Sequence, residues 1–373
     1  MKGSRAWMVA AGVAAVLAVV SGCGPAAKQA EPSLVFYPPP PDPPRLQYLT
    51  TINDAENLVP RGGSFADFIV GAPKKQDKPT EIRSPYGLAV WDGKLYVTDL
   101  GLLKIHVIDF VRKRYSTLGT GDQVMKPAGI AIDADGTKYV ADAGKKQVTV
   151  FDAEDRFVRA LGDPKTCAPI AVAVRGDELF VADALAGRVD VWSKDGTPRR
   201  VISSKGNGPD QLQRPAGIAI GPQGHVYVTD MELSIVKELD VDGRYIKSIG
   251  GPGDRPGYFA RPKGIAIDAA GRIYVADTQW DKVQIFSPEG QLLLYFGEST
   301  RQPHGLVTPT GLAIDTTCLE AFRPYVNKDF EPEYLLLVAN EFGVNKVSVH
   351  AFGHAKPHEA AVSESAPTAR KPG

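Results

Sequence analysis

Apolar positions between residues 261 and 297 predict four short β-strands, at 264–268, 273–277, 283–286 and 292–296. Two turn-forming runs, DAAG and SPEG, separate the first strand from the second and the third from the fourth. Both faces of the resulting antiparallel sheet are apolar, with Ile265 and Ile267 in one phase and Ala266 in the other. One such sheet cannot bury two apolar faces alone, so the pattern predicts that similar sheets pack against it.

Imperfect copies of this stretch recur through most of the chain. The second strand recurs as a run that ends in aspartate in five copies, and as LLVAN in the sixth. A proline opens the first strand of each copy, at positions 42 to 47 residues apart: Pro85, Pro127, Pro169, Pro215, Pro262 and Pro309. A period in this range with four strands per copy indicates a β-propeller. The six copies therefore predict an all-β fold, a six-bladed β-propeller of four-stranded antiparallel blades.

The copies at 126–162 and 261–290 resemble NHL repeats, and the resemblance extends over residues 85–352. It implies a six-bladed propeller that is built mainly for binding. Propellers serve as binding modules and as enzymes alike, so the resemblance does not identify a ligand.

The N-terminus has the features of an export signal. Lys2 and Arg5 precede an apolar stretch at 6–20 that is too short for a stable membrane span. The run VSGC, which ends at Cys23, resembles the bacterial lipobox, and this implies a lipoprotein signal peptide at 1–22 and a lipid on Cys23. We expect a protein of the cell envelope, anchored through lipid to the outer membrane and facing the periplasm or the cell surface. The alternative is an ordinary signal peptide with a chance cysteine.

The segments around the repeats suggest how the ring closes. Prolines dominate the end of residues 23–44, which predicts an extended linker after the lipidated cysteine. Residues 45–52 resemble a fourth strand, which the sixth copy lacks, so we expect this N-terminal strand to close the propeller domain at 45–353. A polar, disordered tail is predicted at 354–373. Insertions at 53–84 and 316–333 are places where a specific function could be added, and the first is expected to pack across one face of the ring.

Composition limits the classes of partner. Lysine plus arginine equals aspartate plus glutamate at 43 each, so bulk charge gives no reason to expect a nucleic acid. Besides Cys23 the chain has Cys167 and Cys318, which the repeat order places near opposite faces, and we expect both to be free thiols.

The repeated aspartates Asp99, Asp142, Asp183, Asp230 and Asp277 permit two interpretations: a ring of metal ligands, or acceptors for backbone N–H groups in the following loops. The second is favoured, because functional sites usually break the symmetry of a repeat. The six histidines show no zinc-binding spacing, and no GxSxG or phosphate-binding loop is present. We therefore expect no metal, no cofactor and no catalytic residue, and predict a non-catalytic binding scaffold that is not an enzyme. The alternative is a metal-dependent lyase or a lactonase-like hydrolase.

The order of strands in a meander places the loops before the first strands and those after the second strands on one face of the ring. Basic residues in the first set and large apolar residues in the second suit an envelope protein or an acidic glycan as partner. The predicted binding residues are Arg83, Lys126, Arg214, Arg261, Lys263, Trp280, His304 and Phe342. The chain is expected to act as a monomer or as a component of a membrane complex. The alternative is that the basic residues pair with nearby aspartates and the apolar ones lie under the 53–84 insertion.

Overall fold

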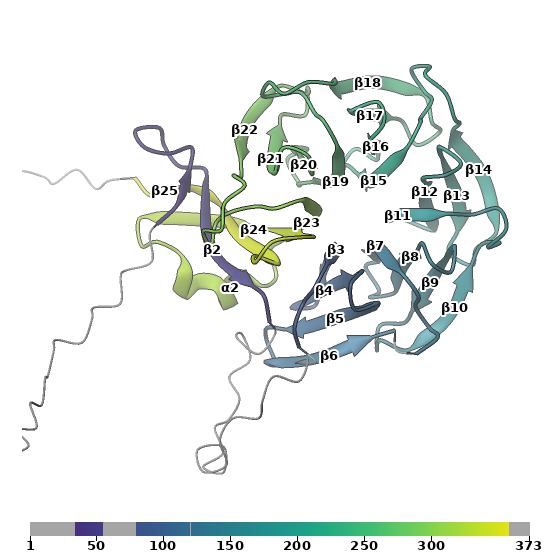
Figure 1. Cartoon of the computed structure of the whole chain (residues 1–373), viewed down its shortest axis with the longest axis horizontal. Coiled ribbons are helices and arrows are strands. Elements are labelled where there is room, and N and C mark those ends of the chain that lie inside the picture. The colour runs from purple at the N-terminus through teal and green to yellow at the C-terminus, as the bar shows by residue number, and fades with distance from the viewer. Residues whose placement is uncertain (1–33, 55–79, 120, 358–373) are drawn as a thin grey trace, which may run out of the picture. The chain divides into compact units, whose positions relative to one another are not determined.

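The computed structural model describes residues 34–54, 80–119 and 121–357. Within these residues, six antiparallel sheets form a ring, with the first strand of each sheet nearest the central axis (Figure 1). This confirms the prediction of an all-β, six-bladed propeller. No helix in the described part of the chain is long and apolar enough to cross a membrane.

The first three blades follow one another along the chain. Their strands are β3 (Pro85–Trp91), β4 (Lys94–Asp99), β5 (Lys104–Asp109) and β6 (Arg114–Leu118) in blade 1; β7 (Pro127–Ile132), β8 (Lys138–Asp142), β9 (Gln147–Phe151) and β10 (Phe157–Leu161) in blade 2; and β11 (Pro169–Arg175), β12 (Glu178–Asp183), β13 (Arg188–Ser193) and β14 (Pro198–Ser203) in blade 3.

The last three blades complete the ring. Their strands are β15 (Pro215–Ile220), β16 (Val226–Asp230), β17 (Ile235–Leu239) and β18 (Tyr245–Gly250) in blade 4; β19 (Pro262–Ile267), β20 (Ile273–Asp277), β21 (Lys282–Phe286) and β22 (Leu292–Phe296) in blade 5; and β23 (Pro309–Asp315), β24 (Phe330–Asn340), β25 (Val347–Ala355), β2 (Leu46–Ile52) and β1 (Phe36–Tyr37) in blade 6. The four strands predicted within 261–297 are those of blade 5, with ends that differ by at most two residues.

Each hydrophobic core lies between neighbouring blades. One core joins Tyr227 and Val236 of blade 4 to Ile265, Val275 and Phe286 of blade 5. The two apolar faces of each sheet are thus covered by the sheets beside it, which is the packing that the repeat pattern predicts. Burial of this kind is the main source of stability for a ring of blades.

Glycine allows the inner strands to approach closely around the axis. A Cβ on Gly264 would lie 1.9 Å from the carbonyl oxygen of Thr310 in the next blade. A Cβ on Gly311 would lie 2.3 Å from the carbonyl oxygen of Tyr86, across the junction of blades 6 and 1. No side chain fits at these separations, so close packing requires the glycine of the Pro-x-Gly pattern that begins five of the six inner strands, whereas blade 3 has Ala171 in this place.

The N-terminal segment closes the ring as predicted. Strand β2 pairs antiparallel with β25 and supplies the fourth strand of blade 6. Strand β1 then pairs with β2 and adds a fifth strand, within a segment that its prolines led us to treat as a linker. The structure also continues β25 to Ala355, two residues beyond the predicted end of the domain.

The insertion in blade 6 packs against blade 1. It contains a short helix, α2 (Leu319–Phe322), and the 3-10 turn η2 (Arg323–Tyr325). Phe322 is buried, and its ring centroid lies 5.0 Å from that of Phe110 in blade 1. Most of the other insertion, 55–79, lies outside the described residues, as do Cys23 with the predicted signal and residues 358–373 of the predicted tail.

Candidate functional site

Alternate strands run in opposite directions, so the propeller has two different faces. We call the face with the loops before the inner strands and after the second strands the proline face. The opposite face, with the loops that join strands one to two and three to four, is called the turn face. The predicted binding residues belong to the proline face.

The repeated aspartates organise the loops of the proline face. Asp230 accepts hydrogen bonds from the backbone N–H groups of Gln213 (2.6 Å), Glu232 (3.0 Å) and Leu233 (3.0 Å). Asp99, Asp142, Asp183 and Asp277 bind the corresponding N–H groups of their own blades, and Asn340 accepts one from Val307. These bonds fix the loop before the inner strand to the turn after the second strand. The interpretation of the aspartates as backbone acceptors is confirmed.

Hydrogen bonds stabilise the ionised form of the buried Asp99 carboxylate. Burial alone would raise the pKa of Asp99, but hydrogen bonds from the buried His106 and from the N–H groups of Arg83, Ser84 and Leu102 lower it to about 2. The imidazole Nε2 of His106 lies 3.0 Å from Oδ2 of Asp99. The carboxylate therefore stays ionised while it is buried.

The predicted basic residues differ in their surroundings. Lys126, Arg214 and Arg261 are exposed, and within the described ranges their side chains form no ion pair. Arg83 is exposed on the same face. Lys263 is largely buried: its Nζ lies 3.2 Å from Oε2 of Glu341 and 5.6 Å from the ring centroid of Tyr86. The alternative that the basic residues pair with acids thus holds for Lys263 and does not hold for Lys126, Arg214 or Arg261.

Tyr86 is a site residue that the sequence analysis did not identify. It lines an axial cavity of about 70 Å³ together with Lys263 and the inner-strand glycines. Burial raises the pKa of Tyr86, and Glu341 raises it further, whereas Arg214 opposes the shift. The residue after the strand-opening proline is neither aromatic nor charged in the other four blades, so Tyr86 and Lys263 break the repeat, and a comparison at this position could have found both.

Exposed apolar side chains are unevenly divided between the two faces. Trp280 is 41% and Phe342 56% exposed, as the prediction requires. The large apolar residues classed as exposed in loops of the proline face are Leu103, Met125, Leu185, Tyr258, Trp280, Phe342 and Val344. In the described loops of the turn face, the exposed large apolar residues are only Val111 and Tyr325. The proline face therefore offers much more apolar surface to a partner.

His304 lies apart from the basic residues near the axis. Its ring centroid is 6.3 Å from that of Tyr48 in blade 6. It lines an outer groove of about 480 Å³ with β1 and β22, whereas the axial cavity is lined by the inner strands. The structure thus does not bring His304 together with Lys263 and Tyr86.

The side chains with metal-binding or nucleophilic chemistry are dispersed. No group of three or more histidine, cysteine, aspartate or glutamate side chains in the described ranges is placed to hold a metal ion. Cys167 and Cys318 are free thiols, as predicted, and burial raises the pKa of each to about 12. Both thiols are therefore protonated and poor nucleophiles at neutral pH.

Comparison with known sequences supports the repeat. The family model described as NHL repeat matches residues 212–232. Protein brain tumor of Drosophila melanogaster is 25% identical over 132 residues, which cover 33% of this chain. The chain covers 12% of that relative's length.

Solved propellers share the fold at low sequence identity. Virginiamycin B lyase from Staphylococcus aureus is 16% identical with a TM-score of 0.51, over 82% of this chain and 84% of that one. A gluconolactonase from Xanthomonas campestris is 16% identical with a TM-score of 0.53, over 86% and 97%. A chain in a nidogen–laminin complex is 18% identical with a TM-score of 0.50, over 62% and 85%.

These neighbours correct the prediction that the chain is not an enzyme. That prediction was wrong because it relied on the absence of recognisable catalytic and metal-binding motifs, whereas lyases and gluconolactonases have the same ring of blades. At these identities the likeness shows the fold alone. The chain is a six-bladed β-propeller, and its residues 212–232 match the model of the NHL repeat.

Proposed function

We propose that this chain is an exported lipoprotein of the cell envelope that binds an envelope protein or an acidic glycan on the proline face of its propeller. The uneven distribution of exposed apolar side chains carries this proposal. Seven large apolar residues are exposed in loops of the proline face, although polar residues would be sufficient to form such loops. Apolar anchors that are surrounded by polar groups are typical of binding surfaces.

The basic residues favour an acidic partner. Lys126, Arg214 and Arg261 occupy the same place in blades 2, 4 and 5, directly before the strand-opening proline. Their charges are not neutralised by ion pairs within the described chain, so they can attract carboxylate or sulfate groups. The neighbour from a nidogen–laminin complex shows that propellers of this fold occur in assemblies with other proteins.

The lipid anchor accounts for the sequence before the propeller. Lys2, Arg5, the apolar stretch at 6–20 and the VSGC run follow the order of a lipoprotein signal. Changing Cys23 to Ser is expected to move the folded protein from the membrane to the soluble fraction, or to leave its signal uncleaved. A Cys23→Ser protein of mature mass that stays in the membrane would contradict the anchor.

Partner capture from native membranes tests the binding face. We expect simultaneous Lys126→Glu, Arg214→Glu and Arg261→Glu substitutions to abolish capture without unfolding the protein, and Trp280→Ala to weaken it. The matched control replaces three exposed basic residues of the turn face, Lys113, Arg244 and Lys328, with glutamate. If the first triple variant captures the same partners as the control, the proline face is not the binding surface.

A further inference from the structure

The loops that lead into blades 4 and 5 share a backbone pattern but differ in their side chains. Each loop holds an isolated parallel bridge, Lys205 with Leu212 and Pro252 with Phe259, and equivalent residues of the two blades lie 47 positions apart. Five residues in and beside the second loop are aromatic or basic: Arg255, Tyr258, Trp280, Lys282 and Tyr295. Their equivalents in blade 4 are Gly208, Gln211, Leu233, Ile235 and Ser248. The loop and blade form without these aromatic and basic side chains, so this break in the repeat points to a function.

These five residues line one small pocket where the outer strand β22 meets the proline face. We call it the aromatic-basic pocket; Asp254, Pro256 and Gln284 complete its lining. Its volume is about 10 Å³, close to the space that one water molecule needs. The aromatic residues beside it are 38% to 44% exposed. A ligand of this pocket would therefore lie across exposed rings and insert only one small group.

Hydrogen bonds fix the walls of the pocket. The buried side chain of Gln284 accepts from the N–H of Gly257 at 2.7 Å and donates to the carbonyl oxygen of Tyr258 at 2.8 Å. The indole Nε1 of Trp280 donates to the carbonyl oxygen of Gly253 at 3.1 Å. These bonds hold the loop and the indole in place before a ligand arrives, so binding has to order little of the pocket.

Two basic side chains lie over rings of this pocket. The guanidinium carbon of Arg255 lies 4.9 Å from the ring centroid of Tyr258, and Nζ of Lys282 lies 5.1 Å from that of Tyr295. Neither cation forms an ion pair with any residue in the described ranges. The carboxylate of Asp254 also lines the pocket, and two cations against one anion leave a net positive charge. The pocket therefore repels a cationic group and favours an anionic one.

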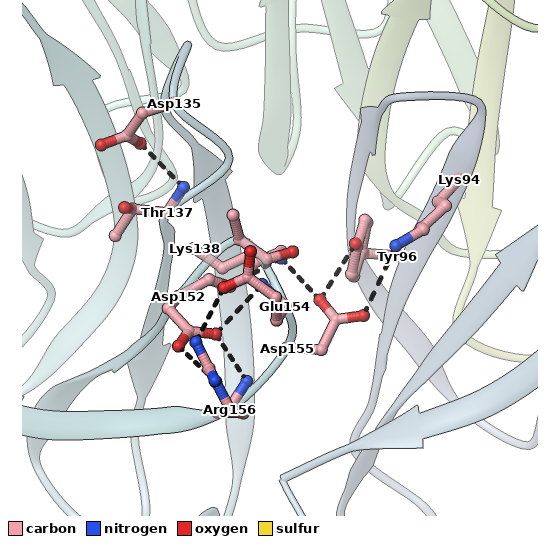
Figure 2. A network of polar contacts seen from close by, with 10 residues as sticks. Lys94, Tyr96, Asp135, Thr137, Lys138, Asp152, Glu154, Asp155 and Arg156 are labelled. Carbon is pink, nitrogen blue, oxygen red and sulfur yellow. Dashed lines mark hydrogen bonds and ion pairs between the residues drawn. The ribbon is translucent and has the colours of Figure 1, made fainter.

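The junction of blades 1 and 2 shows how a purely structural contact between a cation and an aromatic ring differs. Nζ of Lys138 lies 5.3 Å from the ring centroid of Tyr96, but this ammonium group is buried. It contacts Asp155 at 2.5 Å and donates to two backbone carbonyl oxygens at 2.8 and 2.9 Å (Figure 2). An ammonium group has three hydrogens to donate, and these contacts use all of them. Arg255 and Lys282 have no such partners among the described residues, so their donors are available to a ligand.

We propose that the aromatic-basic pocket binds a uronic acid residue of an acidic polysaccharide. The C–H face of the sugar ring packs on the exposed indole of Trp280, and the carboxylate receives hydrogen bonds from Arg255 and Lys282. Sugar hydroxyl groups donate to the carboxylate of Asp254.

The size of the pocket favours a glycan over a protein. A protein partner usually buries an apolar anchor side chain, for which a space of about 10 Å³ is too small. A sugar ring needs no such depth, because it lies flat across the exposed rings. This inference rests on the proposed function, and it selects an acidic glycan as the partner of the proline face.

Titration calorimetry on the full-length protein tests the pocket with a pentamer of β-1,4-linked glucuronate. Cellopentaose, which differs from this probe only in lacking the carboxylates, and pentaglutamate, an acidic peptide, are the comparison ligands. We expect saturable binding of the glucuronate pentamer, at least tenfold tighter than that of either comparison ligand. Arg255→Gln combined with Lys282→Gln should weaken binding of the glucuronate pentamer at least tenfold, because it removes both cations.

Two further variants complete the test. Trp280→Leu restores the residue type of blade 4, so the blade should fold, and it should also weaken binding at least tenfold because the stacking ring is lost. The matched control, Lys113→Gln with Arg244→Gln, removes two exposed charges from the turn face and should leave binding unchanged. Thermal melting verifies that each variant is folded.

The proposal is overturned if the glucuronate pentamer does not bind, if cellopentaose or pentaglutamate binds as tightly, or if either folded pocket variant binds like the wild type. Partner capture from native membranes separates this failure from a failure of the proposed function. If capture still depends on Lys126, Arg214 and Arg261 while the glucuronate pentamer does not bind, the proline face binds a protein and only the glycan site is wrong.

Discussion

The ammonium group of Lys263 lies 3.2 Å from the Oε2 atom of Glu341, and this ion pair joins the inner strand of blade 5 to a loop of blade 6. The same ammonium group lies over the ring of Tyr86 in blade 1. Three consecutive blades therefore meet at one side chain beside the axial cavity. Such a contact fixes the relative positions of the blades at the mouth of the ring.

A double-mutant cycle should detect this pair. We expect Lys263→Met and Glu341→Gln to show a coupling free energy of about 1 kcal/mol in urea unfolding, because both side chains are largely shielded from water. The control pair, Arg244 and Asp242, is exposed with its charges 3.8 Å apart, and its coupling should be close to zero. Equal coupling free energies in the two pairs would show that the position of Lys263 and Glu341 near the axis does not strengthen their interaction.

The glycine at the junction of blades 6 and 1 should tolerate no side chain. Gly311→Ala places a Cβ 2.3 Å from the carbonyl oxygen of Tyr86, and we expect it to lower the free energy of unfolding by about 1–3 kcal/mol. Blade 3 carries Ala171 in the corresponding place, so the reverse change, Ala171→Gly, should cost no more than about 1 kcal/mol. If Gly311→Ala is as mild as Ala171→Gly, the close approach of the strands is not a constraint.

The sequence predicts the ring of blades well because most copies repeat the same physical requirements. A proline opens the inner strand, a glycine permits close packing, and an aspartate such as Asp230 binds the loops together. The fifth strand of blade 6 was not predicted, because prolines in 38–44 favour an extended linker and two residues such as Phe36 and Tyr37 give too short a pattern. Tertiary pairing with β2 decides their structure.

The candidate sites are less predictable because they depend on departures from the repeat. Arg214 and Trp280 could be placed on one face from the order of strands alone. Tyr86 was missed, although it stands where most blades have a small or an aliphatic residue. Such a departure shows where to look, but the axial cavity that Tyr86 lines and its contact with Lys263 arise only when distant segments pack together.

Removal of residues 1–54 tests the closure of the ring. This truncation deletes β1 and β2, leaves the edge of β25 unpaired, and removes the fully buried Leu46 and Ile52. Loss of one buried leucine or isoleucine side chain costs about 2–5 kcal/mol, so we expect the truncated protein to lose cooperative thermal unfolding or to melt far below the wild type. Removal of residues 358–373 is the control, and should leave the melting temperature nearly unchanged. Equal melting of the two truncated proteins would contradict closure by β2.

His350 should make the propeller sensitive to acid. It is fully buried in blade 6, with the rings of Phe296 and Tyr48 at 4.8 and 5.6 Å. Burial lowers its pKa to about 3; the backbone at Leu336 opposes this shift, and His304 makes a smaller contribution in the same direction as burial. In the unfolded chain the pKa of histidine is about 6.5. As the pH falls from about 6.5 to about 3, the imidazole of His350 therefore binds a proton in the unfolded state but stays neutral in the folded state. The stabilisation is complete above pH 6.5 and decreases below it, by about 2 kcal/mol at pH 5.

The variant His350→Leu isolates this effect, because Leu239 fills the corresponding place in blade 4. Urea unfolding of both proteins at pH 7.5 and pH 5 should show that the wild type loses about 2 kcal/mol more than the variant between the two values. The buried His106, whose pKa is also lowered by burial, is present in both proteins and cancels in the comparison. If the two proteins lose the same stability on acidification, His350 either gains a proton in the folded state or finds a partner when charged, and another group must account for the response to acid.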